Sequence, residues 1–392
     1  MTPTTQPIYL DGFATMPLAP EAREAMFVAW ANPANAGSPH ILGELAAASV
    51  AAARATIAEL IGASASEIVF TSGATEANNL ALIGIARWAL ETGNTRQRIV
   101  VSAVEHKAIL EPAHWLKALG FEVIVAPVDH RGAIDCTVLS TLVDEHTLLV
   151  SVMAANNETG VLQPMSDVVA ICRRNGALIH CDGAQAIGKI PLEVVELDLD
   201  YMSFSSHKMY GPAGVGGLYI SAAAPTPRPI HLGGGQQSSV RPGTEPVPLI
   251  IGFGVAAGLA RDRLAADGEH GRQLARRLLA RLHEHQVGCS QITDDAPVLP
   301  GSLSLMAPGI EADDLVAMLR TTVCLSTGSA CTAGQVLPSH VLSAMGMSQV
   351  DASSVFRIYC GRYNTEADID LAATLIADAC LRVRHRTGRP HQ

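Results

Sequence analysis

The feature that most constrains the fold is an alternation of short apolar runs with helical patterns, which begins at Glu67. The runs have the length of strands, and segments with helical periodicity, such as 76–88 and 109–119, separate several of them. Continuous apolar strands that alternate with helices predict an α/β fold with a mostly parallel sheet covered on both faces. In such a sheet, ligands bind at the carboxyl ends of the strands. The predicted strands are EIVF (67–70), RIVVS (98–102), FEVIVAPV (121–128), TLLVSVMA (147–154), ALIHCD (177–182) and DYMSFS (200–205).

The sequence pattern changes after about Pro246. Helical periodicity continues to Leu282, and a shorter set of strand-like runs and helices follows it. A chain of 392 residues is also too long for one compact core, so two domains are expected. We predict a large α/β domain over 15–250 and a smaller α+β domain made of 1–14 and 251–392.

Composition excludes several classes of protein. Hydrophobic residues make up 48% of the chain and charged residues 16%, which indicates a globular rather than a disordered protein. The net charge of −10 repels nucleic acid and anionic membranes, so neither is expected as a direct partner. The N-terminus shows no signal-peptide pattern and the apolar stretch 249–260 is too short to span a bilayer, so we expect a cytoplasmic protein. The eight cysteines form no C-x-x-C pair, which argues against disulfides and structural zinc, and no metal site is expected.

A turn of small residues, 72–75, lies between a predicted strand and a predicted helix. Backbone N–H groups at the start of a helix suit a phosphate, which makes this turn a candidate to bind one. An ordinary turn with Thr75 as the N-cap explains this segment equally well when it is taken alone. A second glycine pattern, 252–257, fits a dinucleotide fingerprint only formally, because its surroundings are helical throughout.

Lys208 stands out among the four lysines of the chain. It directly follows a predicted strand, and the glycine-rich run after it leaves room for a ligand against the backbone. Burial at a strand end lowers the pKa of a lysine, as a Schiff-base lysine needs; a surface lysine in a turn is the alternative. Lys117 lies on an amphipathic helix, and Lys189 lies in a polar connection.

Two further polar residues follow predicted strands. Asp182 closes the strand at 177–182, where a buried carboxylate needs a cationic partner. His106 follows the strand at 98–102 and could stack on a planar cofactor or carry protons. Taken singly, Asp182 could be a helix N-cap and His106 a structural residue. The shared position of Asp182, Lys208 and the 72–75 turn at strand ends favours one common site.

Cys331 differs in setting from the other cysteines. It lies within 326–334, a stretch of small residues with no charge, which predicts an accessible loop that suits a reactive thiol. Most of the others, such as Cys172 and Cys380, lie in apolar runs and are expected in the core. Arg357 is a lone charge in an apolar strand, and its guanidinium needs a carboxylate from the protein or from a substrate.

In combination, these segments resemble the cysteine desulfurases of class V aminotransferase fold, in the branch typified by NifS and IscS. The likeness extends from Tyr9 to the final helix, and a chance match to all of its motifs in order is not credible. The motifs are TSGATEANN (71–79), EHKA (105–108), NNETGVLQP (156–164), HCDGAQAIGK (180–189), SFSSHKMYGPAGVGGLY (203–219), RPGTE (241–245), STGSACTAG (326–334) and PSHVLSAMG (338–346).

The resemblance implies a homodimer with an aspartate-aminotransferase-like large domain that binds pyridoxal 5'-phosphate (PLP). Such an enzyme converts L-cysteine to L-alanine, holds the sulfur as a persulfide on Cys331 and passes it to an acceptor protein for iron–sulfur cluster assembly or for tRNA or DNA thiolation. Lys208 would attach the cofactor, Asp182 would pair with its pyridine nitrogen, and His106 would stack on its ring and move protons. The other implied contacts are Ala74, Thr75, Ser205, His207 and the other subunit's Thr244 for the phosphate, Gln185 and Asn157 for the phenolic oxygen or the substrate, and Arg357, Ala14 and Thr15 for the substrate.

The sequence departs from the family pattern at two places, Gln236–Ser239 and Ala14–Pro17, which concerns substrate and dimer contacts rather than the reaction. Three alternatives remain. Selenocysteine lyase or another class V aminotransferase-fold enzyme uses the same scaffold, and the Cys331 segment favours desulfuration over these. Serine acyl transfer by Ser205 and Lys208 fits S-x-x-K but has no K-T-G motif beside it. A non-catalytic scaffold is disfavoured because Lys208, Asp182 and Cys331 are all present.

Overall fold

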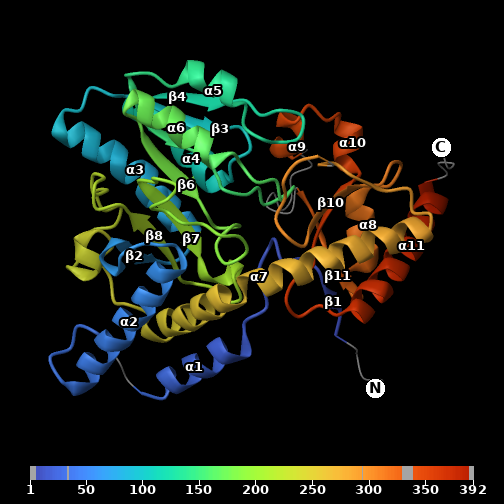
Figure 1. The fold of residues 1–392 in the computed structure, drawn as a ribbon, viewed down its shortest axis with the longest axis horizontal. Coiled ribbons are helices and arrows are strands. Elements are labelled where there is room, and N and C mark those ends of the chain that lie inside the picture. The colour runs from blue at the N-terminus through green and yellow to red at the C-terminus, as the bar shows by residue number, and fades with distance from the viewer. Residues whose placement is uncertain (1–5, 33–34, 294, 329–338, 388–392) are drawn as a thin grey trace.

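The computed structural model describes residues 6–32, 35–293, 295–328 and 339–387 (Figure 1). Its centre is a seven-stranded sheet in the order β2-β8-β7-β6-β5-β3-β4. β8 is antiparallel to both of its neighbours, and the other strands run parallel to one another, which confirms the predicted fold class. The strands are β2 (Ile68–Thr71), β3 (Arg98–Ser102), β4 (Glu122–Ala126), β5 (Thr147–Ser151), β6 (Leu178–Asp182), β7 (Tyr201–Ser205) and β8 (Gly216–Ile220).

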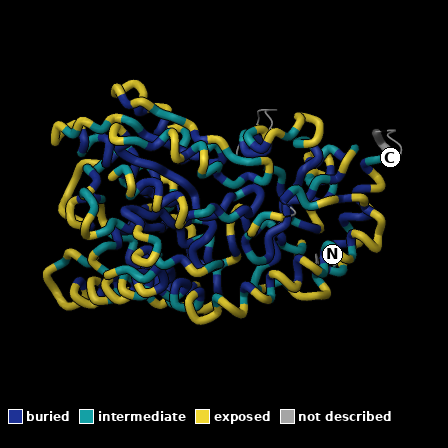
Figure 2. Tube along the Cα trace, turned by 45° about the horizontal axis from the view of Figure 1, so that its top comes forward, coloured by how far each residue is buried: buried dark blue, intermediate teal, exposed yellow. Residues whose placement is uncertain are grey.

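Both faces of this sheet are covered. Alternate residues of a strand point to opposite faces, and β7 shows this because Tyr201 packs in one hydrophobic cluster and Phe204 in another. Figure 2 shows that buried residues run through the interior of the molecule, while exposed residues lie along its outside. The surrounding helices are α3 (Ala74–Thr92), α4 (Lys107–Leu116), α5 (Cys136–Leu142) and α6 (Met165–Asn175), with the 3-10 turns η1 (Ala65–Glu67), η2 (Lys117–Leu119), η3 (Ser206–Lys208) and η4 (Gln236–Ser239).

One long helix, α7 (Val247–Glu284), crosses the molecule (Figure 1). Its first half packs against α1 (Pro20–Trp30) and α2 (Ile41–Leu60) and sends Phe253 into the core of the large sheet. Its second half sends Leu278 into a separate core in the C-terminal region. By length and composition alone, α2 could also cross a membrane, a test that core helices of soluble proteins pass as well.

The C-terminal region has its own sheet, in the order β12-β13-β10-β9, with antiparallel neighbours. The N-terminal strand β1 (Ile8–Tyr9) pairs in parallel with β11 (Val323–Cys324), so the N-terminal segment belongs to this region. Both cores contain residues of α7, so this helix runs through both regions. The domain boundaries, with 15–250 in one domain and 1–14 and 251–392 in the other, stay a prediction. The remaining elements are β9 (Ser290–Gln291), β10 (Ser302–Met306), β12 (Ser326–Thr327), β13 (Val355–Tyr359), α8 (Ala312–Leu319), α9 (His340–Ala344), α10 (Gln349–Ser353) and α11 (Glu366–Thr387).

The glycine-rich run after Lys208 has two uses. Gly214 borders the cavity described below, as predicted for a glycine that leaves room for a ligand. Gly216 and Gly217 instead belong to β8, where side chains would collide with the rest of the sheet. A Cβ on Gly216 would lie 2.6 Å from the Cα of Gly73. Gly216 lets β8 pack closely against the turn that precedes α3, and Gly217 lets it pack against Phe204 of β7.

Candidate active site

A cavity of about 490 Å³ opens at the carboxyl ends of β2, β6 and β7. Strands that run parallel end at the same edge of a sheet, so side chains far apart in the sequence meet there. The structure brings most of the predicted site residues together in this one place. Those that line the cavity are Ala14, Ala74, Thr75, His106, Asn157, Asp182, Gln185, Ser205, His207, Lys208 and Arg357.

Two predicted site residues do not line this cavity, and a third lies outside the described residues. Thr15 is not part of the lining, but its hydroxyl lies 3.0 Å from Nδ1 of His207, which is. Thr244 is exposed and does not line this chain's cavity, which agrees with its expected contact to another subunit without testing it. Cys331 lies outside the described residues.

The turn before α3 provides an open helix N-terminus. Its N-cap is Gly73, with φ of +154°, so no side chain caps the first-turn N–H groups. Thr75 lies inside the helix, which decides against the alternative in which Thr75 is the N-cap. The hydroxyl of Ser205 lies beside this turn, 3.6 Å from where a Cβ on Gly73 would be. Free N–H groups, the helix dipole and a hydroxyl together form a suitable site for a phosphate.

Glu76 brings a negative charge to the same turn, and its partners neutralise it. Arg241 donates to it at 2.7 and 3.2 Å, and the backbone N–H of Ser72 donates at 2.7 Å. Burial opposes ionisation of Glu76, but these hydrogen bonds prevail and lower its pKa. Sequence reasoning did not identify the role of Arg241, because its partner Glu76 lies 165 residues away in the chain.

Asp182 is buried, with 5% of its surface exposed, and both of its oxygens accept hydrogen bonds. The donors are Nδ2 of Asn78 at 2.7 Å and the backbone N–H of Ala184 at 2.9 Å. The Oδ1 atom of Asn78 is buried and has no hydrogen-bond partner among the described residues. Since both residues line the cavity, a polar group of a ligand fits beside them.

His106 caps the start of α4 through its side chain. Its Nδ1 accepts a hydrogen bond from the backbone N–H of Ala108 at 3.1 Å, so the neutral ring carries its proton on Nε2. Burial is the largest effect on this ring and lowers its pKa, while the charge of Asp182 opposes the shift. The imidazole is therefore held in one orientation and in its neutral form beside the cavity.

Lys208 lies in η3, directly after β7, and reaches the N-terminal segment. Its Nζ donates to the carbonyl oxygen of Ala14 at 2.8 Å and also to that of Phe13. Burial, and then the charge of Lys208, lower the pKa of the neighbouring His207 to about 4. We call the side chains on strand ends and helix starts, namely 72–78, His106, Asp182 and 205–208, the sheet wall.

The rest of the cavity is bordered by Arg357 of β13, which is only 3% exposed. Its guanidinium donates to the carbonyl oxygen of Asn157 and to the hydroxyl of Ser326, both at 2.9 Å, and lies 3.8 Å from a carboxylate oxygen of Asp11. Arg357 and these partners form what we call the C-terminal wall. Within the described part of the chain, Asp11 is the residue that forms an ion pair with this guanidinium, and it does so at a long distance.

Glu158, next to Asn157, is also part of the C-terminal wall. Its carboxylate accepts a hydrogen bond from the hydroxyl of Ser339 at 2.5 Å. Burial raises its pKa to about 7, although this hydrogen bond and the charge of Arg357 act in the opposite direction. A Cβ on Gly328 would overlap with the same carboxylate, so Glu158 packs closely against both described residues that flank 329–338.

The polar and charged groups that line the cavity fit one kind of cofactor. An uncapped helix start suits a phosphate, a buried carboxylate suits a protonated ring nitrogen, and a lysine suits an aldehyde. The side-chain oxygen of Asn78 has no hydrogen-bond partner among the described residues, so it could accept a hydrogen bond from a ligand. Pyridoxal phosphate carries all three of these groups on one flat ring.

Comparison with known proteins gives consistent matches over nearly the whole chain. The family model described as aminotransferase class-V matches residues 8–371. A protein named cysteine desulfurase IscS, from Rickettsia akari (strain Hartford), is 40% identical over 388 residues, with 97% of this chain and 92% of the relative covered.

Solved structures give the same result. A NifS-like protein superposes with a TM-score of 0.88 at 37% identity, over 95% of this chain and 99% of its own. A structure described as SspA in complex with cysteine superposes with a TM-score of 0.79 at 32% identity, over 92% of this chain and 100% of its own.

Proposed function

This chain belongs to the class-V aminotransferase family, and from that premise we propose that it is a PLP-dependent cysteine desulfurase. The observation that carries the proposal is the cavity in which Lys208, Asp182 and an uncapped helix start meet. The relatives named cysteine desulfurase, with identity over almost the full length, support this reaction over others on the same fold.

The residues of the sheet wall, together with Gln185 and Asn157, would hold the cofactor. Lys208 would bind its aldehyde, Asp182 its pyridine nitrogen, and Gln185 and Asn157 its phenolic oxygen or the substrate. When bound, PLP supplies an electron sink for the α-carbon of an amino acid. The phosphate contacts are proposed for Ala74, Thr75, Ser205 and His207.

The substrate would be held and deprotonated by residues of both walls. Arg357 binds the carboxylate of cysteine by charge-assisted hydrogen bonds, with Ala14 and Thr15 beside it. His106 would stack on the ring of bound PLP, and the Nε2 edge of its neutral imidazole would be the one that exchanges protons. Lys208 is the second proton carrier, because its amine lies at the same strand end.

Cys331 is proposed as the sulfur acceptor within the enzyme. Its thiolate forms an S–S bond with the sulfur of cysteine while the C–S bond of the substrate breaks. The products are alanine and a persulfide on Cys331, and the terminal sulfur passes on to an acceptor protein. The other cysteines are poor replacements, because burial raises the pKa of Cys172, Cys360 and Cys380 to about 12.

Replacement of Cys331 by serine tests the proposal. A serine hydroxyl is much less acidic than a thiol and cannot carry a persulfide. We expect Cys331→Ser to keep its bound cofactor and a spectral response to added cysteine, but to lose alanine formation and protein-bound sulfane sulfur. Full turnover in this variant, or a persulfide mapped by mass spectrometry to another cysteine of the wild type, would overturn the assignment.

We also propose that the enzyme is a homodimer that pairs through α1 and α2. Apolar side chains are exposed there, including Phe27, Ile41 and Leu45 at 58%, 64% and 57%, beside a groove of about 710 Å³. Arg54 of α2 lies 3.9 Å from Glu245, so Thr244 is on the same side of the molecule. A second copy on this face would cover the apolar surface and receive Thr244 at its phosphate site. Light scattering on the purified protein tests this, and a monomeric mass would contradict it.

A further inference from the structure

Lys189 is a buried lysine beside the active site, although its sequence context predicts only a polar connection. It lies in the turn 184–189 after β6, with 6% of its surface exposed. Among the described residues, the charged group that acts on it is Lys208, which has the same sign. Burial, and then this like charge, lower the pKa of Lys189 well below its usual value. A buried amine beside a like charge lowers the stability of the fold. The presence of Lys189 here therefore indicates a role other than stabilising the fold.

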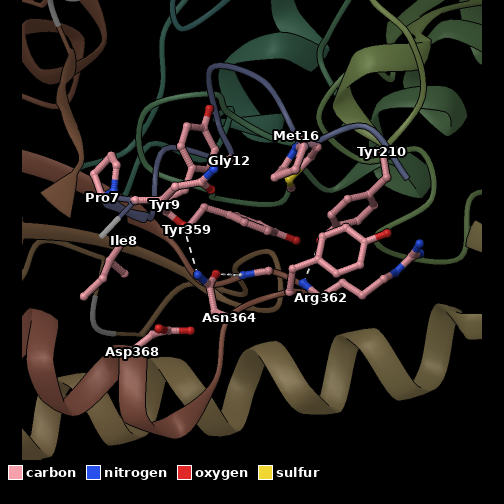
Figure 3. A pocket seen from close by; sticks show the side chains of 14 residues that line it. Pro7, Ile8, Tyr9, Gly12, Met16, Tyr210, Tyr359, Arg362, Asn364 and Asp368 are labelled. Atoms are coloured by element: carbon pink, nitrogen blue, oxygen red, sulfur yellow. Dashed lines mark hydrogen bonds between the residues drawn. The ribbon is translucent and has the colours of Figure 1, made fainter. Parts of the chain in front are cut away.

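Two contacts fix the end of this side chain. Its Nζ donates to Oε1 of Gln185 at 3.1 Å and lies 4.6 Å from the centre of the Tyr359 ring. Tyr359 belongs to β13 and also lines a second cavity, of about 240 Å³, next to Tyr9 and Tyr210 (Figure 3). Lys189 therefore connects a residue of the C-terminal sheet to a residue of the active-site cavity.

The amide of Gln185 is held at both of its ends. Its oxygen accepts from Lys189, and its nitrogen donates to the carbonyl oxygen of Phe13 at 2.9 Å. The same Phe13 oxygen accepts from Nζ of Lys208. An amide nitrogen has two N–H groups, so one is used by Phe13 and the other can serve a ligand in the cavity that Gln185 lines.

We propose that Lys189 is a positioning residue, which holds the Gln185 amide so that its nitrogen, not its oxygen, faces bound PLP. The inference rests on the proposed function. The phenolic oxygen of PLP carries negative charge and accepts hydrogen bonds, so a facing N–H stabilises it and a facing carbonyl oxygen repels it. Lys189 acts on the cofactor only through Gln185.

Lys189→Met tests this, because methionine is of similar length and has no N–H donor. The pH at which the visible absorbance of the bound cofactor titrates should rise by about half a unit or more, since a donor that stabilises the deprotonated oxygen is lost. Cofactor loss on dialysis should be about three- to tenfold faster, the equivalent of one hydrogen bond. The melting temperature should stay the same or rise, because the variant removes a buried amine that no carboxylate of the described residues pairs with.

Three variants serve as controls. Lys189→Arg keeps a donor and should restore most of the absorbance titration. Lys117→Met, at the exposed lysine of η2, should behave as the wild type. In a Gln185→Ala background, Lys189→Met should cause no further shift.

The outcomes separate the two proposals. An unshifted titration in Lys189→Met, an equal shift in the Gln185→Ala background, or a variant that does not fold would each overturn the positioning role. A wild-type protein that binds no PLP would instead overturn the proposed function.

Discussion

The two walls of the active-site cavity are built in different ways. The sheet wall consists of strand ends and helix starts of one parallel-rich sheet, and its register fixes Asp182 and Lys208 at the same edge. The C-terminal wall is assembled from distant pieces of chain, because Arg357 of β13 contacts Asn157 and Asp11. The first wall offers what a cofactor needs, and the second offers what an amino-acid substrate needs. Cofactor binding and substrate use should therefore respond separately to substitution.

Lys208→Ala should have the largest effect and tests the sheet wall. Turnover of cysteine should fall by at least about 10³-fold, because the variant loses both the covalent link to the cofactor and a proton carrier. Borohydride treatment should no longer fix PLP to the protein, while Lys117→Ala should behave as the wild type. A reducible PLP adduct that persists in Lys208→Ala would show that another lysine holds the cofactor.

Arg357→Ala should have an intermediate effect, and only on the substrate. A charge-assisted contact to a carboxylate is worth roughly 1.5–3 kcal/mol, so the KM for cysteine should rise by about ten- to a hundredfold. PLP content should remain near that of the wild type. Arg362→Ala is a matched control, since this arginine is also buried but pairs with Asp267 and does not line the active-site cavity. If the KM for cysteine is unchanged in Arg357→Ala, then Arg357 has a structural role, and the two walls do not differ in function as proposed.

Glu158→Gln should have the smallest effect, visible only as a pH dependence of stability. The folded protein raises the pKa of Glu158 to about 7, so its stabilising contribution is complete below about pH 4.5 and is lost as the pH rises through 7. Glutamine still accepts from Ser339 but does not ionise. From pH 5 to pH 8, the wild type should lose roughly 2–3 kcal/mol of unfolding free energy relative to the variant. Urea unfolding at both pH values measures this, and an equal difference at the two values would refute it.

Much of the large sheet could be predicted from the sequence, because its parallel strands are buried on both faces and appear as continuous apolar runs. β3 was predicted with its observed bounds. β8 was not predicted, since Gly216 and Gly217 have no strand preference of their own. Their place in a strand depends on close packing against Phe204 and Gly73, which only the folded chain brings near.

In the site, the strand-end rule located Asp182 and Lys208, but the long-range contacts that Asn78 makes with Asp182 and Arg241 makes with Glu76 could not be found in this way. Asn78 and Arg241 act across large sequence separations. For Lys189 a signal did exist, because it follows Gln185 by four residues, the spacing that places two side chains on one side of a helical turn.

The unusual segment Gln236–Ser239 also became interpretable only in three dimensions. Gln237, Ser238 and Ser239 all have positive φ, a costly conformation for residues other than glycine. The side-chain oxygen of Gln237 compensates by accepting from the backbone N–H of Phe70 at 2.8 Å and from Arg54 at 2.9 Å. This segment thereby fixes the loop that carries Thr244 against β2 and α2.

The continuity of α7 has a consequence for how the protein melts. The helix has 38 residues and is about 57 Å long, at 1.5 Å per residue. Each half is anchored in a different core, so neither core can come apart without exposing one half of a helix that the other core still holds. We therefore expect the two cores to unfold as one cooperative unit, which calorimetry would show as a single peak. The active-site cavity should be lost at the same temperature as both sheets.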